Sequence, residues 1–535
     1  MYFIPARSAK GLSGTSSGSE IFRRNAAAIC GIIYGIGQPK GEIPDMKASN
    51  ISFDRRSFMA GLGAFSFSAF GAIDLAPTTD FKGTVKGRRL KIASIACDRM
   101  GGSATESLIK AGCDLVAVCD VNPKAFDRWE KKYPGIPKFT DYREMLKAMG
   151  DKFEAVQIGT PDHTHAYIAI DCMKAGKHVY VQKPLARTVE ECELMLETQL
   201  KTGVVAQMGN QGHPGVWRYK ALRDAGAWGD VREIYSWSDR PVWPQGMKEY
   251  AKAQPLPAGY APNAWDCWCG PAEDHGYSPA YHTFKWRGWW AYGCGAIGDM
   301  AVHNADPAFW ALELGLPVKV KADTFGEGPV TIAYPKKSRI EMTFAPNKWV
   351  PKGVKLVWTD GGVKPDAKSV PGLEAFALAA AERREAKKAA DAKKKGREYK
   401  RPAALAPDVP GNGVIIVGTK ATTIGGSHAS RPDCIAGDRA AFESAIKSGD
   451  KAAGYSHYRE FVEACLANDP SRCGSRLAYA APLTEALLIG CIALRYPGEE
   501  LVFDPKKMRF TNKPSANRFL RAPRRGEWDF AKLMG

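Results

Sequence analysis

Three side chains in this sequence belong to the types that move protons to and from a hydroxyl group. Lys183 follows the apolar run 179–181, and Asp299 and His303 lie four residues apart. A lysine whose pKa is lowered by desolvation can protonate and deprotonate a hydroxyl, and a carboxylate one helical turn from a histidine can orient its imidazole. These residues predict proton transfer at a hydroxyl, although single lysines and helix-buried Asp and His side chains also occur in purely structural positions.

A second group of residues has the order of a dinucleotide-binding motif. The run 90–96 is predicted to be a strand, the glycines at 101–102 to open a helix over 103–111, and the run 115–120 to be a strand that ends at Asp120. Backbone N–H groups at a helix N-terminus bind phosphate, and a carboxylate at the end of the second strand hydrogen-bonds a ribose diol. The arrangement therefore predicts a dinucleotide site.

The glycine pattern of this motif is incomplete. In the frame G-x-G-x-x-G the chain has Ala96 first, Asp98 second and Gly101 third. Asp98 stands where backbone normally meets the pyrophosphate, and its charge would repel the phosphates unless it turns away or is neutralised, for instance by Arg99. A Rossmann-like domain with weakened or lost cofactor binding is therefore an alternative.

From residue 88 onward, short apolar runs alternate with segments of helical periodicity, a pattern typical of βαβ units on a parallel sheet. Further strands are predicted at 156–159, 179–181 and 204–208, and a further helix at 167–175. The alternation then stops, and strand-like runs follow at 231–238, 318–325, 338–344, 353–359 and 413–417. These runs predict a second domain with a largely antiparallel sheet.

The chain divides by these patterns into a leader over 1–87, a Rossmann domain over 88–208 and an α+β domain over 209–535. The α+β domain contains a charged insertion at 371–410 and a basic tail at 505–535. The stretch 371–401 is rich in Ala, Lys, Glu and Arg and has almost no large apolar residues after Leu378, so it can form a solvated helix but has little to bury.

The formal net charge of +18 over 535 residues does not indicate a nucleic-acid partner. Residues 1–56, 371–401 and 505–535 carry +4, +5 and +7, which leaves only +2 for the remainder of the chain. The lysines at 393–395 have no aromatic residues between them, as a surface for single-stranded nucleic acid would need. The charge is therefore interpreted as a leader, a solvated helix face and a tail.

The thirteen cysteines have no regular spacing and include no C-x-x-C pair, so neither a disulfide framework nor a structural metal site is predicted. We interpret them mainly as small core residues. Ten of the fourteen tryptophans lie between Trp217 and Trp310, where they could line a sugar-binding cleft or fill the junction between the domains. Filling of the core is the favoured interpretation.

The leader is similar to an export signal. Arg55 and Arg56 are followed by Ser-Phe-Met and by the apolar run 60–73, which is too short and too weakly hydrophobic to span a bilayer as a stable helix. Paired arginines in this setting resemble the twin-arginine signal, whose cargo crosses the membrane already folded. A periplasmic or otherwise extracytoplasmic protein without stable membrane insertion is expected; the alternative is a buried amphipathic helix with two chance arginines.

Several motifs occur in a fixed order along the mature chain. They are Cys-Asp-Val-Asn at 119–122, Gly-Thr-Pro-Asp-His-Thr-His at 159–165, Gln-Lys-Pro at 182–184, Gly-Asn-Gln-Gly-His at 209–213, Trp-Arg-Gly-Trp-Trp at 286–290 and Gly-Asp-Met-Ala-Val-His at 298–303. With the Rossmann start they resemble the Gfo/Idh/MocA family of oxidoreductases over 91–528. The resemblance implies an α/β Rossmann domain plus an α+β domain with a large open-faced, mostly antiparallel sheet that packs into homodimers or homotetramers. It also implies NAD or NADP at the first domain and a sugar or cyclitol between the two.

The resemblance further implies roles for individual residues. Lys183 is the expected general acid and base, with Asp299 and His303 as its catalytic partners. The residues expected to contact the cofactor are Ala96, Asp98, Arg99, Met100, Gly101, Asp120, Thr160, Pro161, His165, Gln182 and Lys183. Those expected to contact the substrate are Asn210, Gln211, His213, Trp286 and Arg287. Gln182 stands where the family tripeptide usually has glutamate, and no metal is expected at His163 and His165, which fit the family's cofactor-edge loop.

The leading hypothesis from the sequence is an exported NAD(P)-dependent oxidoreductase that acts on a sugar or cyclitol hydroxyl with a tightly bound cofactor. Asp120 favours NAD, because its carboxylate would repel the 2′-phosphate of NADP. Two alternatives remain. One is an NAD-dependent glycoside hydrolase that works by oxidation and elimination. The other, motivated by Asp98 and Gln182, is a non-catalytic carbohydrate-binding protein with a degenerate cofactor site.

Overall fold

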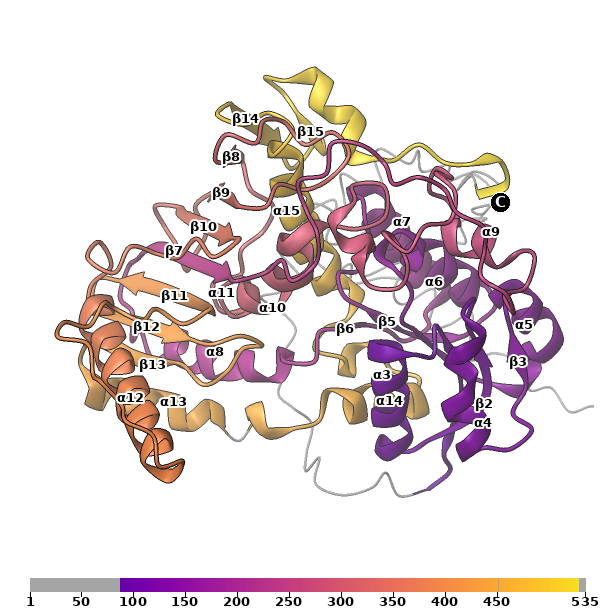
Figure 1. Ribbon diagram of the computed structural model, residues 1–535, viewed down its shortest axis with the longest axis horizontal. Helices are drawn as coiled ribbons and strands as arrows, with labels where there is room; N and C mark the ends of the chain where they lie inside the picture. The colour runs from indigo at the N-terminus through magenta and orange to yellow at the C-terminus, as the bar shows by residue number, and fades with distance from the viewer. Residues whose placement is uncertain (1–86, 451, 529–535) are drawn as a thin grey trace, which may run out of the picture. The chain divides into compact units, whose positions relative to one another are not determined.

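The computed structural model describes residues 87–450 and 452–528. The predicted export signal at Arg55 and Arg56 and the end of the predicted basic tail, from residue 529, lie outside these described residues. The described chain forms two β-sheets with their helices (Figure 1).

Six parallel strands form the first sheet, in the spatial order β3-β2-β1-β4-β5-β6. The strands are β1 Leu90–Ile95, β2 Cys113–Cys119, β3 Lys138–Phe139, β4 Ala155–Ile158, β5 His178–Gln182 and β6 Ala206–Gly209. Central runs such as Val179 to Val181 have no polar alternation because helices bury both faces of the sheet. The strand order reverses between β1 and β4, where doubly wound sheets bind ligands at their carboxyl edge. The predicted Rossmann architecture is confirmed.

Two groups of helices cover this sheet. One face carries α3 Arg99–Ala111, α4 Asp127–Lys132 and α14 His457–Ala467. The other carries α5 Tyr142–Met149, α6 His165–Lys174 and α7 Val189–Thr202. Helix α14 comes from the region that the sequence pattern assigns to the second domain, yet Phe461 and Val462 pack in one core with Leu90 and Leu108. A helix from the region after residue 208, the predicted boundary between the domains, therefore covers part of the first sheet.

Helix α3 begins at Arg99, earlier than the predicted start at residue 103, so that Gly101 lies within its first turn. A Cβ atom at Gly101 would lie 1.9 Å from the carbonyl oxygen of Ala96, which leaves no room for a side chain. Ala96 has φ +58°, in the left-handed region that glycine adopts without steric cost. The third glycine of the motif is therefore required for packing, while alanine at the first position keeps the backbone shape at a cost of about 1 kcal/mol.

The second sheet has nine strands in the order β13-β12-β11-β7-β10-β9-β8-β14-β15. They are β7 Val231–Ser238, β8 Lys319–Asp323, β9 Ser338–Phe344, β10 Val354–Asp360, β11 Asn412–Gly418, β12 Ala421–Gly425, β13 Asp433–Gly437, β14 Glu500–Asp504 and β15 Arg509–Phe510. Strands β7 and β10 are parallel and every other neighbouring pair is antiparallel, so the mostly antiparallel sheet is confirmed. The sequence pattern does not predict β12 to β15, which are short and lack a clear alternation.

The helices on the buried face of the second sheet share one core with the first domain. They are α8 Val216–Asp224, α11 Asp306–Leu312, α13 Arg439–Asp450 and α15 Leu477–Ala493. Helix α15 also contacts α7 and β6 of the Rossmann domain. The continuous core fixes the edge of the first sheet against the second.

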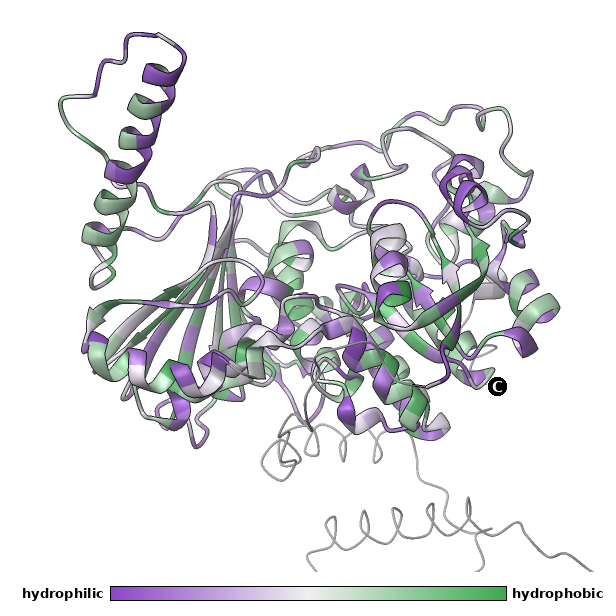
Figure 2. Cartoon of the chain, turned by 90° about the horizontal axis from the view of Figure 1, so that it is seen from below, coloured by the Kyte–Doolittle hydropathy of each residue, from purple (hydrophilic) through white to green (hydrophobic). Residues whose placement is uncertain are grey.

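The predicted insertion at 371–410 contains the helix α12, Leu373–Lys394. Leu373 packs with Trp237 and Ile415 on the opposite face of the second sheet, so the first turns of α12 are not solvated on all sides. Figure 2 shows the helix projecting from the sheet and becoming hydrophilic along its length. Beyond Leu378, where little burial is predicted, the helix still buries Ala381 and Glu385.

A long segment without strands, residues 239–296, connects β7 to the helices before β8. It contains α9, Ala264–Cys269, and an aromatic core of its own that comprises Trp268, Tyr281, Trp286, Trp289 and Tyr292. Much of the tryptophan excess therefore fills a core, as expected from the sequence.

The described part of the basic tail packs on its own chain. Arg524 pairs with Glu190 of α7, and Arg525 lies 2.8 Å from Asp266 of α9. Trp528 stacks edge-on against the aromatic ring of Tyr167, in α6. Part of the tail's positive charge is therefore neutralised within the molecule.

Between residues 87 and 528, apart from residue 451, no helix is both long and apolar enough to cross a membrane. The twelve cysteines of the described ranges are all free, and all but Cys267 are buried. This burial agrees with the interpretation of the cysteines as small core residues.

Replacement of Gly101 by alanine tests the close approach of α3 to β1. The new methyl group would overlap the Ala96 carbonyl, so we expect the free energy of unfolding to fall by about 1–3 kcal/mol. Denaturant titration followed by circular dichroism measures the change. Gly150→Ala is the matched control, because Gly150 has helical φ and open space around it and the variant should be as stable as the parent or slightly more so. Equal stability of the two variants would contradict the close packing.

Candidate active site

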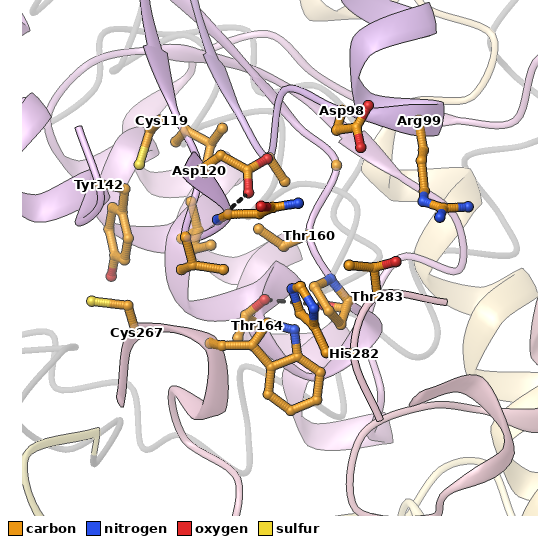
Figure 3. A pocket seen from close by; sticks show the side chains of 18 of the residues that line it. Asp98, Arg99, Cys119, Asp120, Tyr142, Thr160, Thr164, Cys267, His282 and Thr283 are labelled. Atoms are coloured by element: carbon orange, nitrogen blue, oxygen red, sulfur yellow. Dashed lines mark hydrogen bonds between the residues drawn. The ribbon is translucent and has the colours of Figure 1, made fainter. Parts of the chain in front are cut away.

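A cavity of about 490 Å³ opens at the carboxyl ends of β1, β2 and β4. Its Rossmann side includes Asp98, Asp120 and Thr160, and its other side is formed by the segment 239–296 around His282 (Figure 3). The volume is within the range of sites that enclose a small ligand or part of a cofactor. Its place at the carboxyl edge agrees with the expected nucleotide site.

Asp120, which directly follows β2, lines this cavity (Figure 3). Its Oδ2 accepts a hydrogen bond from the N–H of Cys97 and its Oδ1 one from the N–H of Asn122, both at 2.9 Å. These bonds orient the carboxylate and leave each oxygen a lone pair for a ligand hydroxyl. Burial raises the pKa of Asp120 to about 7, and the two backbone donors offset this only in part. A ligand diol would favour the ionised form.

The N-terminus of α3 faces the same cavity. Asp98 is the N-cap residue, but its side chain accepts no capping hydrogen bond and lies in the cavity wall with Arg99 and Met100. The Asp98 and Arg99 side chains are separate in Figure 3, so the neutralisation considered from the sequence is not formed there. Arg128 also lines the cavity and pairs with Glu106 at 2.6 Å. An anion bound here would be attracted by the N-terminus of α3 and by the guanidinium groups of Arg99 and Arg128, and it would be repelled by the carboxylate of Asp98.

Thr160 and Pro161, directly after β4, line the cavity as well. The hydroxyl of Thr160 is buried and has no hydrogen-bond partner in the described part of the chain, which leaves it available to a ligand. His165 is outside the lining, and its ring nitrogens lie 2.9 Å from the carbonyl oxygens of Thr160 and Pro184. Burial lowers the pKa of His165 to about 4, and the neutral ring connects the loop after β4 to the loop after β5.

Lys183, the first residue after β5, contacts Asp299 of the second domain. Its Nζ lies 2.7 Å from Oδ1 of Asp299 and 2.7 Å from the main-chain oxygen of the same residue. The two side chains are only 11% and 9% exposed. Asp299 lies in a π-helical turn, Ile297–Ala301, that continues into α10, Val302–Asn304. The regular helix predicted from the spacing of Asp299 and His303 is therefore replaced by a rarer turn, of a kind that concentrates at functional sites.

Two arginines also face Asp299. The Nε of Arg287 lies 3.4 Å from Oδ1 and the Nε of Arg240 lies 3.9 Å from Oδ2. Burial alone would raise the pKa of Asp299, but the charges of Lys183 and Arg287 hold it below its ordinary value and keep the carboxylate ionised. Arg287 also lines the cavity. The ion pair of Lys183 and Asp299 is therefore next to the cavity, although neither residue lines it.

His303 is held by a chain of buried polar groups. Asn210 donates through Nδ2 to the main-chain oxygen of Val302 at 3.0 Å and to Oδ2 of Asp306 at 2.9 Å, so its Oδ1 accepts from Nδ1 of His303 at 2.6 Å. The imidazole therefore carries its proton on Nδ1, and its Nε2 is free to accept another. Burial and the charge of Lys183 hold the pKa of His303 well below its ordinary value, so the ring is neutral.

The residues expected to contact substrate fall into two groups. Trp286 and Arg287 line the cavity. Asn210 and His213 are buried, and both contact the carboxylate of Asp306, so they act through other residues. The sequence could not separate these groups, because burial is a property of the assembled fold.

Gln182 and Gln211 contact each other rather than the cavity. Nε2 of Gln211 lies 3.3 Å from Oε1 of Gln182. Nε2 of Gln182 is buried and finds no acceptor among the residues that the structure describes. The expected cofactor contacts of Gln182 and Lys183 are therefore not seen in the cavity lining.

Two titratable residues of the site are not among the residues predicted for it, although Asp162 lies within the motif at 159–165. Asp162 is buried, accepts the N–H of Cys294 at 3.1 Å, and has its pKa raised by burial to about 7. His428, in the turn between β12 and β13, stacks on His303 with 3.9 Å between ring centroids. The backbone of His428 has φ +59° and packs against Gly212. A Cβ atom at Gly212 would lie only 2.4 Å from the His428 carbonyl oxygen, so this approach requires glycine. A single histidine in a glycine-rich turn has no periodicity from which to predict this contact.

His163 contacts only backbone and aromatic groups. Its Nε2 lies 2.8 Å from the main-chain oxygen of Trp268 and its Nδ1 3.1 Å from that of Tyr292. Burial lowers the pKa of His163 to about 3, so the neutral ring connects the Rossmann loop to the segment 239–296. Within the described ranges no three His, Cys, Asp or Glu side chains gather as a metal site requires.

A parallel sheet with a cavity at its carboxyl edge, joined through a lysine–aspartate pair to a second sheet, is the architecture of a two-domain nucleotide-dependent enzyme. Two family models match the chain: "Oxidoreductase family, NAD-binding Rossmann fold" over residues 91–210 and "Oxidoreductase family, C-terminal alpha/beta domain" over residues 234–364. Residues 91–210 and 234–364 thus match the two domains of the Gfo/Idh/MocA family of oxidoreductases, and the first of them is an NAD-binding Rossmann domain.

Curated relatives match limited regions. A 1-carboxy-3-chloro-3,4-dihydroxycyclohexa-1,5-diene dehydrogenase of Comamonas testosteroni is 35% identical over 125 residues, which cover 23% of this chain and 31% of that protein. An alpha-N-acetylgalactosaminidase of Shewanella oneidensis is 39% identical over 100 residues, which cover 17% of this chain and 21% of that protein. The chain thus spans less than a third of the length of either relative.

A solved structure shares the fold. The WlbA dehydrogenase from Chromobacterium violaceum, solved in complex with NADH and UDP-GlcNAcA, has a TM-score of 0.50 and 15% identity. The match covers 79% of this chain and 98% of that chain. At this identity the likeness concerns the fold.

The affinity for NAD should depend on pH through Asp120. With a pKa of about 7, the ionised fraction of this carboxyl rises from about one tenth at pH 6 to about nine tenths at pH 8. If the ribose diol binds the ionised form, Kd for NAD should fall about tenfold over this range, as isothermal titration calorimetry can measure. Asp120→Asn should bind weakly at every pH. Asp98→Asn is the control: it should bind more tightly and stay pH-dependent, with the midpoint moved to lower pH because the charge of Asp98 helps to raise the pKa of Asp120. A pH-independent Kd in the parent protein would refute the role of Asp120.

The position of the His303 proton can be tested through Asn210. In Asn210→Ala the imidazole loses the acceptor of its Nδ1 proton, so we expect both neutral tautomers in the ¹⁵N spectrum of labelled protein and a turnover reduced about 10- to 100-fold. Kd for NAD should not change. His303→Gln assigns the signal, and Gln211→Ala, a neighbour without a bond to His303, should keep the parent spectrum. An unchanged tautomer in Asn210→Ala would contradict the proposed chain.

Proposed function

We propose that this protein is an NAD-dependent oxidoreductase that acts on a hydroxyl group of a sugar or cyclitol. The observation that carries the proposal is the nearly buried ion pair of Lys183 and Asp299 beside a cavity at the carboxyl edge of an NAD-binding domain. A buried lysine next to a carboxylate has a cost in desolvation, which a structural role alone does not explain.

The residues around the cavity fit NAD. Asp120 would bind the ribose diol, the N-terminus of α3 with Arg99 the diphosphate, and Thr160 would supply its unpartnered hydroxyl. The carboxylate of Asp120 favours NAD over NADP. When bound, NAD accepts a hydride from the carbon that carries the reacting hydroxyl, or returns one to it.

Lys183 moves the proton of that hydroxyl. Asp299 fixes its ammonium group by two contacts at 2.7 Å, so that Nζ keeps one direction for a substrate oxygen. In reduction, Lys183 donates a proton to the carbonyl oxygen as it becomes a hydroxyl; in oxidation the proton returns. The charge of Lys183 helps to keep the nearby His303 imidazole neutral, and its free Nε2 can accept a hydrogen bond from the substrate hydroxyl.

A second candidate function is NAD-dependent glycoside hydrolysis. It is supported by the similarity to the alpha-N-acetylgalactosaminidase of Shewanella oneidensis. Oxidation of a ring hydroxyl would acidify the adjacent C–H, and the aglycone would leave by elimination. Water would then add to the resulting double bond, and the hydride would return to the sugar. This route needs the same proton-moving residues and produces no net NADH.

A carbohydrate-binding protein without cofactor is less well supported. Asp98 and Gln182 motivate that hypothesis, but Asp120 is held by two backbone donors with lone pairs free, and the Thr160 hydroxyl is buried without a partner in the described chain. Polar groups of this kind are costly to bury unless a ligand binds them. They support a cofactor site that is in use.

We further propose that the protein is exported through its twin-arginine motif and assembles as a homodimer or homotetramer. Arg55 and Arg56 support the first point, and the family resemblance supports the second. An exported enzyme meets no free NAD pool, so the cofactor would remain bound between turnovers. Trp528 of the tail and the segment 239–296 line the outer side of the cavity, which is consistent with a retained cofactor.

Lys183→Met tests the proposal. Native mass spectrometry and absorbance in the nicotinamide band of the purified holoprotein should reveal bound NAD in both parent and variant. Turnover of a panel of sugars and cyclitols should fall about 10²- to 10⁴-fold in Lys183→Met, because the proton donor is lost. Lys201→Met, at an exposed position paired with Glu197, is the control and should keep full activity.

Three outcomes separate the candidate functions. Protein that contains no dinucleotide and binds neither NAD(H) nor NADP(H) would refute both enzymatic functions. Unchanged turnover in Lys183→Met would refute its role. Release of the aryl group from a synthetic aryl glycoside without net NADH formation would favour the hydrolase.

A further inference from the structure

Three cationic side chains converge on the single carboxylate of Asp299. Lys183 lies 2.7 Å from Oδ1, Arg287 3.4 Å from Oδ1 and Arg240 3.9 Å from Oδ2. Lys183 and Arg287 are only 11% and 18% exposed, so water screens their charges poorly. One carboxylate balances one of the three charges, and the cluster keeps a positive excess.

The neighbouring titratable groups do not remove this excess. Asp162 is within reach of the charges of Lys183 and Arg287, but burial raises its pKa to about 7, so it carries only about half a negative charge at neutral pH. Burial and the charge of Lys183 lower the pKa values of His303 and His428, so neither adds a positive charge. The net charge around Asp299 therefore stays positive.

Both arginines still have hydrogen-bond donors to offer. The guanidinium of Arg240 makes no hydrogen bond within the described chain and is 36% exposed. Arg287 stacks on the ring of Trp286 at 4.1 Å, and its Nη1 has a long contact of 3.4 Å with the carbonyl of Phe284. A stacked guanidinium with unused N–H groups is well oriented for a planar carboxylate.

The cofactor does not account for the whole cluster. Arg287 lines the cavity, whereas Arg240 and Lys183 do not. Arg240 follows β7 of the second sheet, where its N–H donates to the Ser238 hydroxyl at 3.1 Å and its carbonyl accepts from Gly361 at 2.6 Å. Its side chain is therefore presented from the substrate domain by a fixed backbone.

We propose that the substrate carries a carboxylate close to the reacting hydroxyl, as uronic and aldonic acids do, and that Arg240 and Arg287 bind this carboxylate. The inference rests on the proposed function and specifies its substrate class. A bound carboxylate supplies the missing counter-charge and orients the neighbouring hydroxyl toward Lys183. A neutral sugar leaves the two arginines without a partner and binds more weakly.

The test compares binding of matched ligands to the NAD-loaded protein by isothermal titration calorimetry. Uronates and aldonates should bind at least about tenfold more tightly than the corresponding neutral sugars, because hydrogen bonds between arginine and a carboxylate are stronger than hydrogen bonds between neutral groups. Arg240→Gln, which leaves Arg287 to bind the carboxylate without it, should lower this preference, while Kd for NAD stays the same because Arg240 does not line the cavity. Arg218→Gln, which removes a guanidinium paired with Asp450 away from the site, should keep the preference.

The outcomes distinguish this inference from the proposed function. Turnover of neutral sugars with no preference for acids would overturn the inference and leave the oxidoreductase function intact. Equal affinity for acids and neutral sugars, an undiminished preference in Arg240→Gln, or no binding of any member of the acid panel would each overturn it as well. Tighter binding of acids by protein that shows no redox turnover would support the carboxylate site and refute the proposed function.

Discussion

The ion pair between Lys183 and Asp299 is the contact on which the rest of the site depends. It joins the first residue after β5 to a π-helical turn of the second domain, and both side chains are almost buried. Such a pair is stable only if its remaining polar atoms are satisfied. The main-chain oxygen of Asp299 binds the same ammonium group, and Arg287 faces the same carboxylate from the cavity wall. The pair therefore couples the cofactor domain to the substrate domain through charge.

A second constraint lies in the hydrogen-bonded chain that runs from the carboxylate of Asp306 through Asn210 to His303. Asp306 and Asn210 fix which ring nitrogen carries the proton, and Lys183 with burial keeps the ring neutral. The free Nε2 is thus a consequence of hydrogen-bond geometry at residues that touch no ligand. This arrangement explains why Asn210, which sequence reasoning assigns to substrate, lies behind the reacting groups. Positioning residues and contacting residues look alike in a sequence, because both are polar and both follow strand ends.

The architecture could be predicted because it follows local patterns. Strands β7 and β9 agree with their predicted bounds, 231–238 and 338–344, since apolar and polar residues alternate there with the period of a half-buried strand. Helix α14 could not be placed, because its apolar face packs on a sheet formed by residues that precede it by some 350 positions. The burial of the first turns of helix α12 could not be predicted for the same reason, because Leu373 contacts the core around Trp237 only in the folded sheet.

By itself the sequence determined the two-domain architecture with its NAD-binding Rossmann domain, and it predicted the dinucleotide site around Asp120 and Lys183, Asp299 and His303 as the proton-moving set. These depend on residue type, on strand and helix periodicity and on position at a strand end, all of which are local. Only the tertiary structure decided that His165 binds backbone, that Asn210 positions His303, and that Asp162, Arg240 and His428 belong to the site. Burial, pKa shifts and the balance of charge around Asp299 arise from segments far apart in the chain, so no local pattern could reveal them.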